Sequence, residues 1–205
     1  MSSAIPAPTW PTLARRLSAV VVTAFLGALA APPALAELKV GDAAPAFEAD
    51  ATLAGEPFRF VLADALRKGP VVLYFYPKAF TKGCTIEANR FAEAAPHYAD
   101  LGATVIGISG DDIETLNRFS VTECRSRFAV ASDRGGSIMK AYDARMPFSD
   151  TYAKRVSYVI SPQGRILHAI TSMGPEEHVP STLEALERWA ARQPSGDTPS
   201  RRPPR

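Results

Sequence analysis

The chain has 205 residues, 46% of them hydrophobic, and a formal net charge of +2. That length fits one globular domain with appended segments, and the nearly balanced charge excludes the basic surface that nucleic-acid binding requires. Two cysteines are too few for a scaffold held together by disulfides. His97, His168 and His178 have no metal-ligand spacing, and no phosphate-binding glycine loop is present, so we expect neither a metal nor another cofactor.

Residues 1–36 have the composition of a secretory signal peptide. They contain no acidic residue, and Arg15-Arg16 precede the apolar stretch Leu17–Ala31 and an Ala-x-Ala site that ends at Ala36. Cleavage after Ala36 would lower the formal charge from +2 to 0, because two arginines and no acids are lost. We expect a periplasmic or secreted protein without stable membrane insertion. An uncleaved membrane anchor is the alternative, and both the general and the twin-arginine export routes stay open.

The first predicted elements follow this segment. Alternation over Phe58–Leu62 predicts a short strand, and the continuous apolar run Val71–Tyr76 predicts a strand that is covered on both faces. Apolar residues then recur at helical spacing from Cys84, with Gly102 as a stop. Pro96 lies inside this pattern, so we expect a kink or break just before it.

A second strand–helix pair comes next. Ala103–Ser109 predicts a buried strand, and Asp111 or Asp112 can cap a helix that runs to about Cys124. The later elements that we expect are a short strand at Phe128–Ala131, a brief helix near Ser137–Tyr142, a hairpin of Val156–Ile160 and Ile166–Ile170, and a helix over Glu176–Ala191. This order indicates an α/β fold in which helices flank a mixed central sheet, within a domain of residues 37–192. The Pro-, Ser- and Arg-rich tail 193–205 is expected to be disordered.

The feature that carries chemistry is Cys84, at the point where the buried strand gives way to a helix. The free N–H groups and the positive end of the dipole at a helix N-terminus favour a thiolate, which is the nucleophilic form of cysteine. A buried structural thiol is the alternative. The residues around it are Pro77-x-x-x-Thr81-x-x-Cys84, followed by Thr85 and Glu87-Ala88.

This pattern resembles the active-site signature of the peroxiredoxin (AhpC/TSA) family. The lead-in Tyr74–Lys78 is most similar to the PrxQ, or bacterioferritin comigratory protein, branch, and the resemblance extends from Gly41 to the last helix. It implies a thioredoxin-like fold and thiol-dependent reduction of hydrogen peroxide and organic hydroperoxides. A thioredoxin-like or other thiol reductant would complete the cycle, and by analogy with this branch we expect a monomer.

The resemblance also implies a role for each residue of the motif. Cys84 would attack a peroxide oxygen and become a sulfenic acid. Thr81 offers a hydroxyl that can both accept and donate, Pro77 would shield the pocket, and backbone N–H groups near Gly83 and Cys84 could bind the second oxygen. Arg155 matches the family's arginine at the start of a late strand, and Glu87 could orient it. A surface charge for Arg155 and a solvated first-turn acid for Glu87 are the alternatives.

Cys124 is the one candidate for a resolving cysteine. In many relatives that cysteine lies five residues after the reactive one, where this chain has Asn89. Some relatives use a cysteine on the following helix, which Cys124 could match; otherwise it is a core thiol and an external thiol reduces Cys84. Phe80 stands where relatives usually have polar residues, and it suggests a preference for apolar hydroperoxides.

Two other functions fit the same fold class less well. A thiol–disulfide oxidoreductase would need a Cys-x-x-Cys motif, and Thr81 stands in the place of its first cysteine. A redox-regulated binding or holdase protein would need an exposed apolar patch or a regular oligomer, neither of which the sequence predicts.

Overall fold

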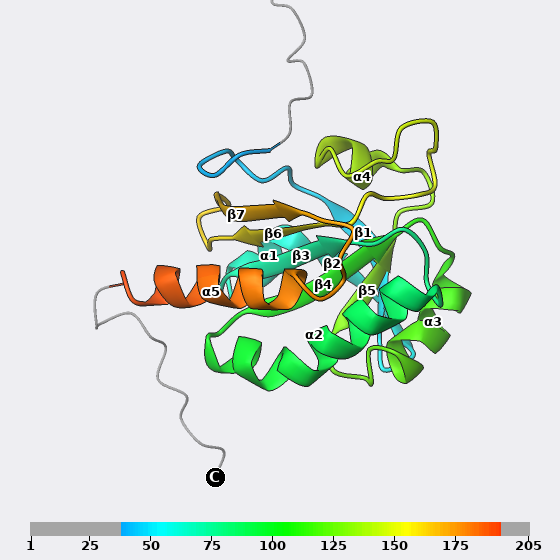
Figure 1. Ribbon diagram of the computed structural model, residues 1–205, viewed down its shortest axis with the longest axis horizontal. Coiled ribbons are helices and arrows are strands. Elements are labelled where there is room, and N and C mark those ends of the chain that lie inside the picture. The colour runs from blue at the N-terminus through cyan, green and yellow to red at the C-terminus, as the bar shows by residue number, and fades with distance from the viewer. Residues whose placement is uncertain (1–37, 194–205) are drawn as a thin grey trace, which may run out of the picture. The chain divides into compact units, whose positions relative to one another are not determined.

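A computed structural model describes residues 38–193 (Figure 1). The predicted signal peptide, residues 1–36, and all but the first residue of the predicted tail 193–205 lie outside the described residues. Within the described part, no helix is both long and apolar enough to cross a membrane.

The fold centres on a mixed sheet of seven strands in the order β2-β1-β5-β4-β3-β6-β7. The strands are β1 (Glu48–Leu53), β2 (Glu56–Val61), β3 (Val71–Phe75), β4 (Thr104–Ser109), β5 (Ala129–Ser132), β6 (Val156–Ile160) and β7 (Ile166–Thr171). Strands β3, β4 and β5 pair in parallel, whereas the outer strands pair antiparallel. The predicted α/β class with a mixed sheet is therefore confirmed.

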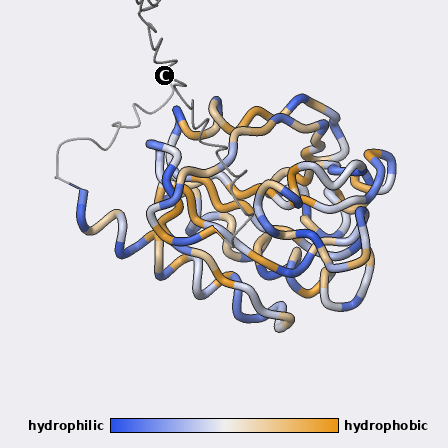
Figure 2. The backbone as a smooth tube through the Cα atoms, turned by 90° about the horizontal axis from the view of Figure 1, so that it is seen from above, coloured by the Kyte–Doolittle hydropathy of each residue, from blue (hydrophilic) through white to orange (hydrophobic). Residues whose placement is uncertain are grey.

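Five helices cover the two faces of this sheet. They are α1 (Leu62–Leu66), α2 (Lys82–Asp100), α3 (Ile113–Thr122), α4 (Ser137–Ala141) and α5 (His178–Ala190). Buried residues of α2, α3 and α5 pack on one face, and those of α1 and α4 on the other (Figure 1). The apolar segments gather in the strands at the centre, and the polar ones lie outside (Figure 2).

Strand β6 shows how one segment serves both faces. Successive side chains of a strand point to opposite sides. Tyr158 accordingly belongs to the cluster under α1 and α4, whereas its neighbour Val159 belongs to the cluster under α2, α3 and α5. Arg155 and Ser157 share the parity of Val159, so they point toward α2 and α5.

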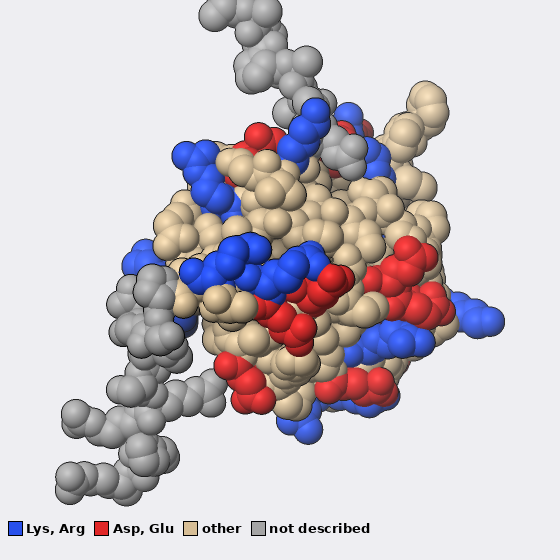
Figure 3. Space-filling view, turned by 60° about the vertical axis from the view of Figure 1, so that its left-hand side comes forward, with Lys and Arg blue, Asp and Glu red and all other residues tan. Residues whose placement is uncertain are grey.

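Several predicted elements occur with small shifts at their ends. The strand in Phe58–Leu62 is β2, the capped helix is α3 with Asp112 as its N-cap, and the predicted hairpin is β6–β7. Strand β1 and helix α1 were not predicted. On the face in Figure 3, Lys and Arg side chains alternate with Asp and Glu side chains, which agrees with the balanced composition.

Of the kink or break expected before Pro96, the break is wrong, because α2 continues through Pro96 to Asp100. A proline inside a helix costs about 3 kcal/mol through the lost hydrogen bond and a clash. Here the helix is anchored on both sides of Pro96 by the fully buried rings of Phe91 and Tyr98. The Tyr98 hydroxyl also lies 2.7 Å from Thr182 Oγ1 on α5. This packing explains why the helix survives the proline.

Candidate active site

Cys84 lies where the sequence predicts it, at the junction of a central strand and a helix. It is the third residue of α2 and is 1% exposed. Thr81 is the N-cap residue, and its carbonyl accepts the first helical hydrogen bond, from Thr85 N at 2.9 Å. The first four N–H groups of a helix lack partners within it, so this end of α2 presents donors and partial positive charge. The sulfur therefore lies in an environment that favours its anion.

Arg155, the residue that immediately precedes β6, reaches this sulfur. Its Nη2 lies 3.5 Å from Cys84 Sγ, and its Nη1 donates to Glu87 Oε2. The arginine is 4% exposed and Glu87 is fully buried. Burial acts to raise the pKa of Glu87, whereas the charge of Arg155 and its hydrogen bond to the carboxylate act to lower it and favour the ionised form. The two alternatives considered for these residues, a surface charge and a solvated acid, are both wrong.

Gly83 makes the approach of the guanidinium possible. A Cβ at this position would lie 3.0 Å from Arg155 Nη2, closer than ordinary van der Waals contact. The glycine next to the reactive cysteine thus leaves the space that the arginine occupies.

Asp111 fixes the loop that joins β3 to α2. Its Oδ2 accepts from Ala79 N at 2.7 Å and from Ser109 Oγ at 2.8 Å. Phe80, the next residue of the loop, has a left-handed backbone (φ 63°) and is 45% exposed, and its ring packs edge-on against Phe119. A carboxylate from the neighbouring strand end therefore holds the loop in a conformation that is costly for a non-glycine residue.

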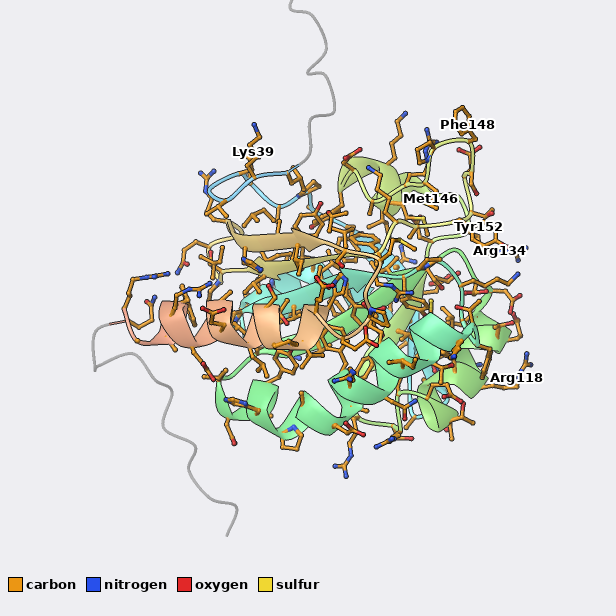
Figure 4. All side chains as sticks on the ribbon, in the orientation of Figure 1. Lys39, Arg118, Arg134, Met146, Phe148 and Tyr152 are labelled. Carbon is orange, nitrogen blue, oxygen red and sulfur yellow. The ribbon has the colours of Figure 1, made fainter. Side chains whose placement is uncertain are left out.

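Thr81 and Pro77 flank the thiol on this same loop. The Thr81 hydroxyl donates to Lys78 O at 2.9 Å, which leaves its lone pairs free to accept. Pro77 is half-buried and, with Lys78 and Tyr152, lines a hollow of about 130 Å³. Tyr152 belongs to the loop after α4, which also carries the fully exposed Phe148 (Figure 4). Pro77 and Thr81 thus share the loop that leads into α2, while Arg155 follows Cys84 by 71 residues in the sequence.

Cys124 is a fully buried free thiol just past the end of α3, in the same apolar cluster as Cys84. Burial raises the pKa of its thiol strongly. Its neighbours on both sides contact α2: Glu123 Oε2 lies 3.3 Å from Asn89 Nδ2, and Arg125 Nη1 lies 3.3 Å from Glu93 Oε1. The segment that carries the second thiol is thereby held against the helix that carries the first.

One further part of the site was not identified from the sequence. His178, for which the sequence predicts no metal-binding role, is fully buried and hydrogen-bonded to Ser157 and Ser172. Its Nδ1 lies 3.8 Å from Glu87 Oε1. The sequence does indicate that Ser157, the hydrogen-bond partner of His178, shares a face with Arg155, because the two residues are two positions apart along a strand.

Known proteins resemble the chain over nearly all of the described region. Residues 40–169 match the model of the AhpC/TSA family. The chain is 33% identical over 148 residues to the chloroplastic peroxiredoxin Q of Oryza sativa subsp. japonica, which is 72% of this chain and 66% of that protein. It is 32% identical over 153 residues to the chloroplastic peroxiredoxin Q of Populus jackii, 74% of this chain and 70% of that one. The chain thus spans about two thirds of the length of these relatives.

Solved structures share its architecture. Peroxidoxin BcpB from Mycobacterium tuberculosis superimposes with a TM-score of 0.68 at 29% identity, over 74% of this chain and 98% of that one. A cysteine-to-serine variant of PrxQ from Xylella fastidiosa gives 0.66 at 25% identity, over 76% and 99%. These neighbours confirm the predicted thioredoxin-like fold. The chain belongs to the AhpC/TSA family of peroxiredoxins, on the branch that includes peroxiredoxin Q and the bacterioferritin comigratory protein.

Proposed function

We propose that the protein is a thiol-dependent peroxidase that reduces hydrogen peroxide and organic hydroperoxides at Cys84. The observation that carries the proposal is the contact of 3.5 Å between Arg155 Nη2 and Cys84 Sγ, at the N-terminal end of α2. A guanidinium stays charged at all relevant pH values and offers several donors in a fixed plane. It can stabilise the thiolate and still bind a peroxide oxygen.

The chemical step transfers one oxygen atom to sulfur. The Cys84 thiolate attacks one oxygen of the peroxide, the O–O bond breaks, and its electron pair leaves with the second oxygen. That oxygen takes up a proton and departs as water or an alcohol, while the sulfur becomes a sulfenic acid. Arg155 and the N–H groups at the start of α2 would stabilise the negative charge on the departing oxygen. The Thr81 hydroxyl would accept a hydrogen bond from the peroxide and orient it.

The sulfenic acid must then be reduced by a second thiol. Attack by Cys124 would form a disulfide and release water, after which a thioredoxin-like reductant would restore both thiols. The shared apolar cluster and the contacts that hold Cys124 against α2 support this route. A disulfide requires α-carbons within about 7 Å, so the first turn of α2 would unwind to present Cys84. Direct reduction by an external thiol is the alternative.

Rapid mixing of the reduced protein with hydrogen peroxide tests the proposal. Fast loss of the Cys84 thiol, abolished in Cys84→Ser, is the expected result. A protein that is inert to peroxide but reduces a protein disulfide would instead be a thiol–disulfide oxidoreductase. In Cys124→Ser, a stable sulfenic acid on Cys84 would identify Cys124 as the resolving thiol, whereas unchanged kinetics and products would favour the external thiol.

We also propose that the protein is exported and acts as a monomer in the periplasm or outside the cell. The acid-free, Arg-containing segment 1–36 with its Ala-x-Ala end supports export. N-terminal sequencing of the protein from fractionated cells tests this, with Glu37 as the expected first residue. An intact N-terminus in the membrane fraction would favour the anchored alternative, and sedimentation of the mature protein tests the monomer.

A further inference from the structure

Arg155 and Glu87 lie next to Cys84, and a histidine lies next to Glu87. The peroxide chemistry described above does not involve this histidine. His178, the first residue of α5, is fully buried. Its Nδ1 lies 2.8 Å from Ser157 Oγ and 3.8 Å from Glu87 Oε1. Its Nε2 lies 3.0 Å from Ser172 O. Both ring nitrogens therefore have fixed partners inside the protein.

These partners define the protonation of the ring. A carbonyl oxygen can only accept, so Nε2 must carry the proton that is donated to Ser172 O. In the neutral ring Nδ1 is then an acceptor, and it receives the hydroxyl proton of Ser157. Burial is the main cause that lowers the pKa of His178, and the charge of Arg155 also lowers it. The hydrogen bond to Ser172 O and the exposed Glu177 at the start of α5 act in the opposite direction without reversing the shift. The neutral tautomer fits both the geometry and the surroundings.

A neutral His178 leaves Glu87 with Arg155 as its charged partner. Glu87 Oε2 accepts from Arg155 Nη1, and the buried Oε1 has no hydrogen-bond donor within the described residues. A protonated His178 would offer Glu87 a second cation, and it would draw the carboxylate away from the arginine. The charge state of the His178 ring thus determines whether Arg155 is the only cation that pairs with Glu87 among the described residues.

The same residues form a closed loop of contacts around the arginine. The side chain of Arg155 pairs with Glu87, which faces His178. His178 donates to Ser172 O, and Ser172 N in turn donates to the backbone carbonyl of Arg155 at 3.3 Å. Ser157, two residues along the same strand, ties the other side of the ring to β6. The histidine is therefore linked by hydrogen bonds to the backbone around Arg155 and lies against Glu87, the charge partner of the arginine.

We propose that His178 is a positioning residue of the thiol centre, which acts through Glu87 and Arg155 and does not touch the peroxide. Its neutral ring confines the Glu87 carboxylate, and the confined carboxylate holds the guanidinium where Nη2 meets Cys84 Sγ. As a positioning role in peroxide reduction, the inference rests on the proposed function. The effect on the thiolate itself does not require peroxide and can be measured separately.

The experiment compares His178→Leu with the matched control His168→Leu. His168 is a partly buried histidine that is hydrogen-bonded to Ser181 of α5 at 2.7 Å, and within the described residues no hydrogen bond or ion pair joins it to Glu87. The reaction of Cys84 with the uncharged reagent iodoacetamide, located by mass spectrometry, reports the thiolate over a range of pH. Rapid mixing with hydrogen peroxide reports oxidation. Circular dichroism and urea unfolding verify that each variant is folded.

For His178→Leu we expect both rates at neutral pH to fall about tenfold, because a displaced guanidinium would lose the hydrogen bond of Arg155 Nη2 to Cys84 Sγ. The rate-versus-pH profile should move toward alkaline pH and reach the parental rate at its plateau. His178→Asn keeps an acceptor for Ser157 and should recover part of the loss, and Ser157→Ala should show a smaller loss in the same direction. His168→Leu should match the parent.

Equal rates in His178→Leu and His168→Leu would overturn the proposal, as would a loss in His178→Leu that is the same at every pH. If the folded parent is not oxidised by peroxide, the proposed function fails, but the alkylation profiles still decide the role of His178. If His178→Leu does not fold, Ser157→Ala still tests the proposal, because an unshifted rate-versus-pH profile in Ser157→Ala would also refute the positioning role of His178.

Discussion

Replacement of Gly83 by alanine tests the arginine–thiol contact without removing any of its polar groups. A Cβ at Gly83 would lie 3.0 Å from Arg155 Nη2 and 3.9 Å from Cζ, whereas ordinary contact begins near 3.4 Å. The guanidinium must therefore retreat by a few tenths of an ångström. It cannot do so freely, since Nη1 is paired with the buried Glu87 and Nη2 already lies 3.5 Å from Cys84 Sγ. The methyl group should displace Nη2 from its contact with the sulfur.

The size of the effect follows from the strength of that contact. A hydrogen bond to a charged group contributes about 1.5–3 kcal/mol, and loss of the lower amount slows a reaction by about tenfold. We expect Gly83→Ala to lower the rate of Cys84 oxidation by at least this factor. Stability should not fall, because alanine gains about 0.5–1 kcal/mol over glycine within a helix, which offsets the local crowding.

Rapid mixing with hydrogen peroxide and urea unfolding measure the two quantities on the same samples. Gly135→Ala is the control, since a Cβ there meets nothing within 4 Å; its oxidation rate should equal that of the parent. Oxidation of Gly83→Ala at the parental rate would refute the claim that the arginine must occupy this space. If Gly83→Ala lost both oxidation rate and stability, the lower rate would be explained by damage to the fold and not by displacement of the guanidinium.

Three further changes probe other parts of the structure. Arg155→Met should abolish fast oxidation and destabilise the protein by about 3–5 kcal/mol, because Glu87 stays buried without its cation. The double variant Arg155→Met/Glu87→Gln should regain stability in urea unfolding but should still not be oxidised in rapid mixing. Recovery of oxidation in the double variant would contradict the role of Arg155. Phe80→Gly, which removes an exposed ring and suits the left-handed backbone, should lower the rate with an alkyl hydroperoxide relative to hydrogen peroxide; an unchanged ratio would contradict a role in specificity. The Thr115 N–H holds the pKa of Asp112 below its usual range, so the stability from this cap is present above the ordinary aspartate pKa and is lost as pH falls through the lowered one. Asp112→Ala should therefore reduce the melting temperature at neutral pH and match the parent in acid, and a pH-independent difference in calorimetry would refute this sign.

The part of the site that the sequence could predict is the part with strong local signals. The position of Cys84 between a strand and a helix could be predicted because the continuous apolar run Val71–Tyr76 precedes it and a helical pattern follows it. The match of Arg155 depended on the family resemblance, since nothing local distinguishes an arginine at a strand end. Its contact with Cys84 is a consequence of β3 and β6 being neighbours in the sheet, and pairing of strands distant in sequence is not encoded in any short segment.

The elements that were missed have weak local signals. Strand β1 buries alanines and a threonine, so its alternation carries little hydrophobic contrast, and pairing on both sides with β2 and β5 stabilises it. Helix α1 has five residues, too few for a helical period to stand out. The complete burial of Glu87 and His178 depends on the packing of α2 and α5 against one another and against β6. An acid in a first helical turn is usually solvated, and only the tertiary arrangement makes this one an exception.

The alternation of side chains along β6 has a consequence for folding. A slip of one residue in its pairing would exchange the two faces of β6, so that the apolar Val156 would take the place of Arg155 and the guanidinium would turn to the opposite face of the sheet, away from Glu87. Such a misaligned chain would be unstable and would also lack the cation beside its sulfur. Chains that become reactive toward peroxide during refolding are therefore those in which β6 has paired in the correct register. The rate at which the peroxide-reactive thiol reappears would measure how fast this register forms.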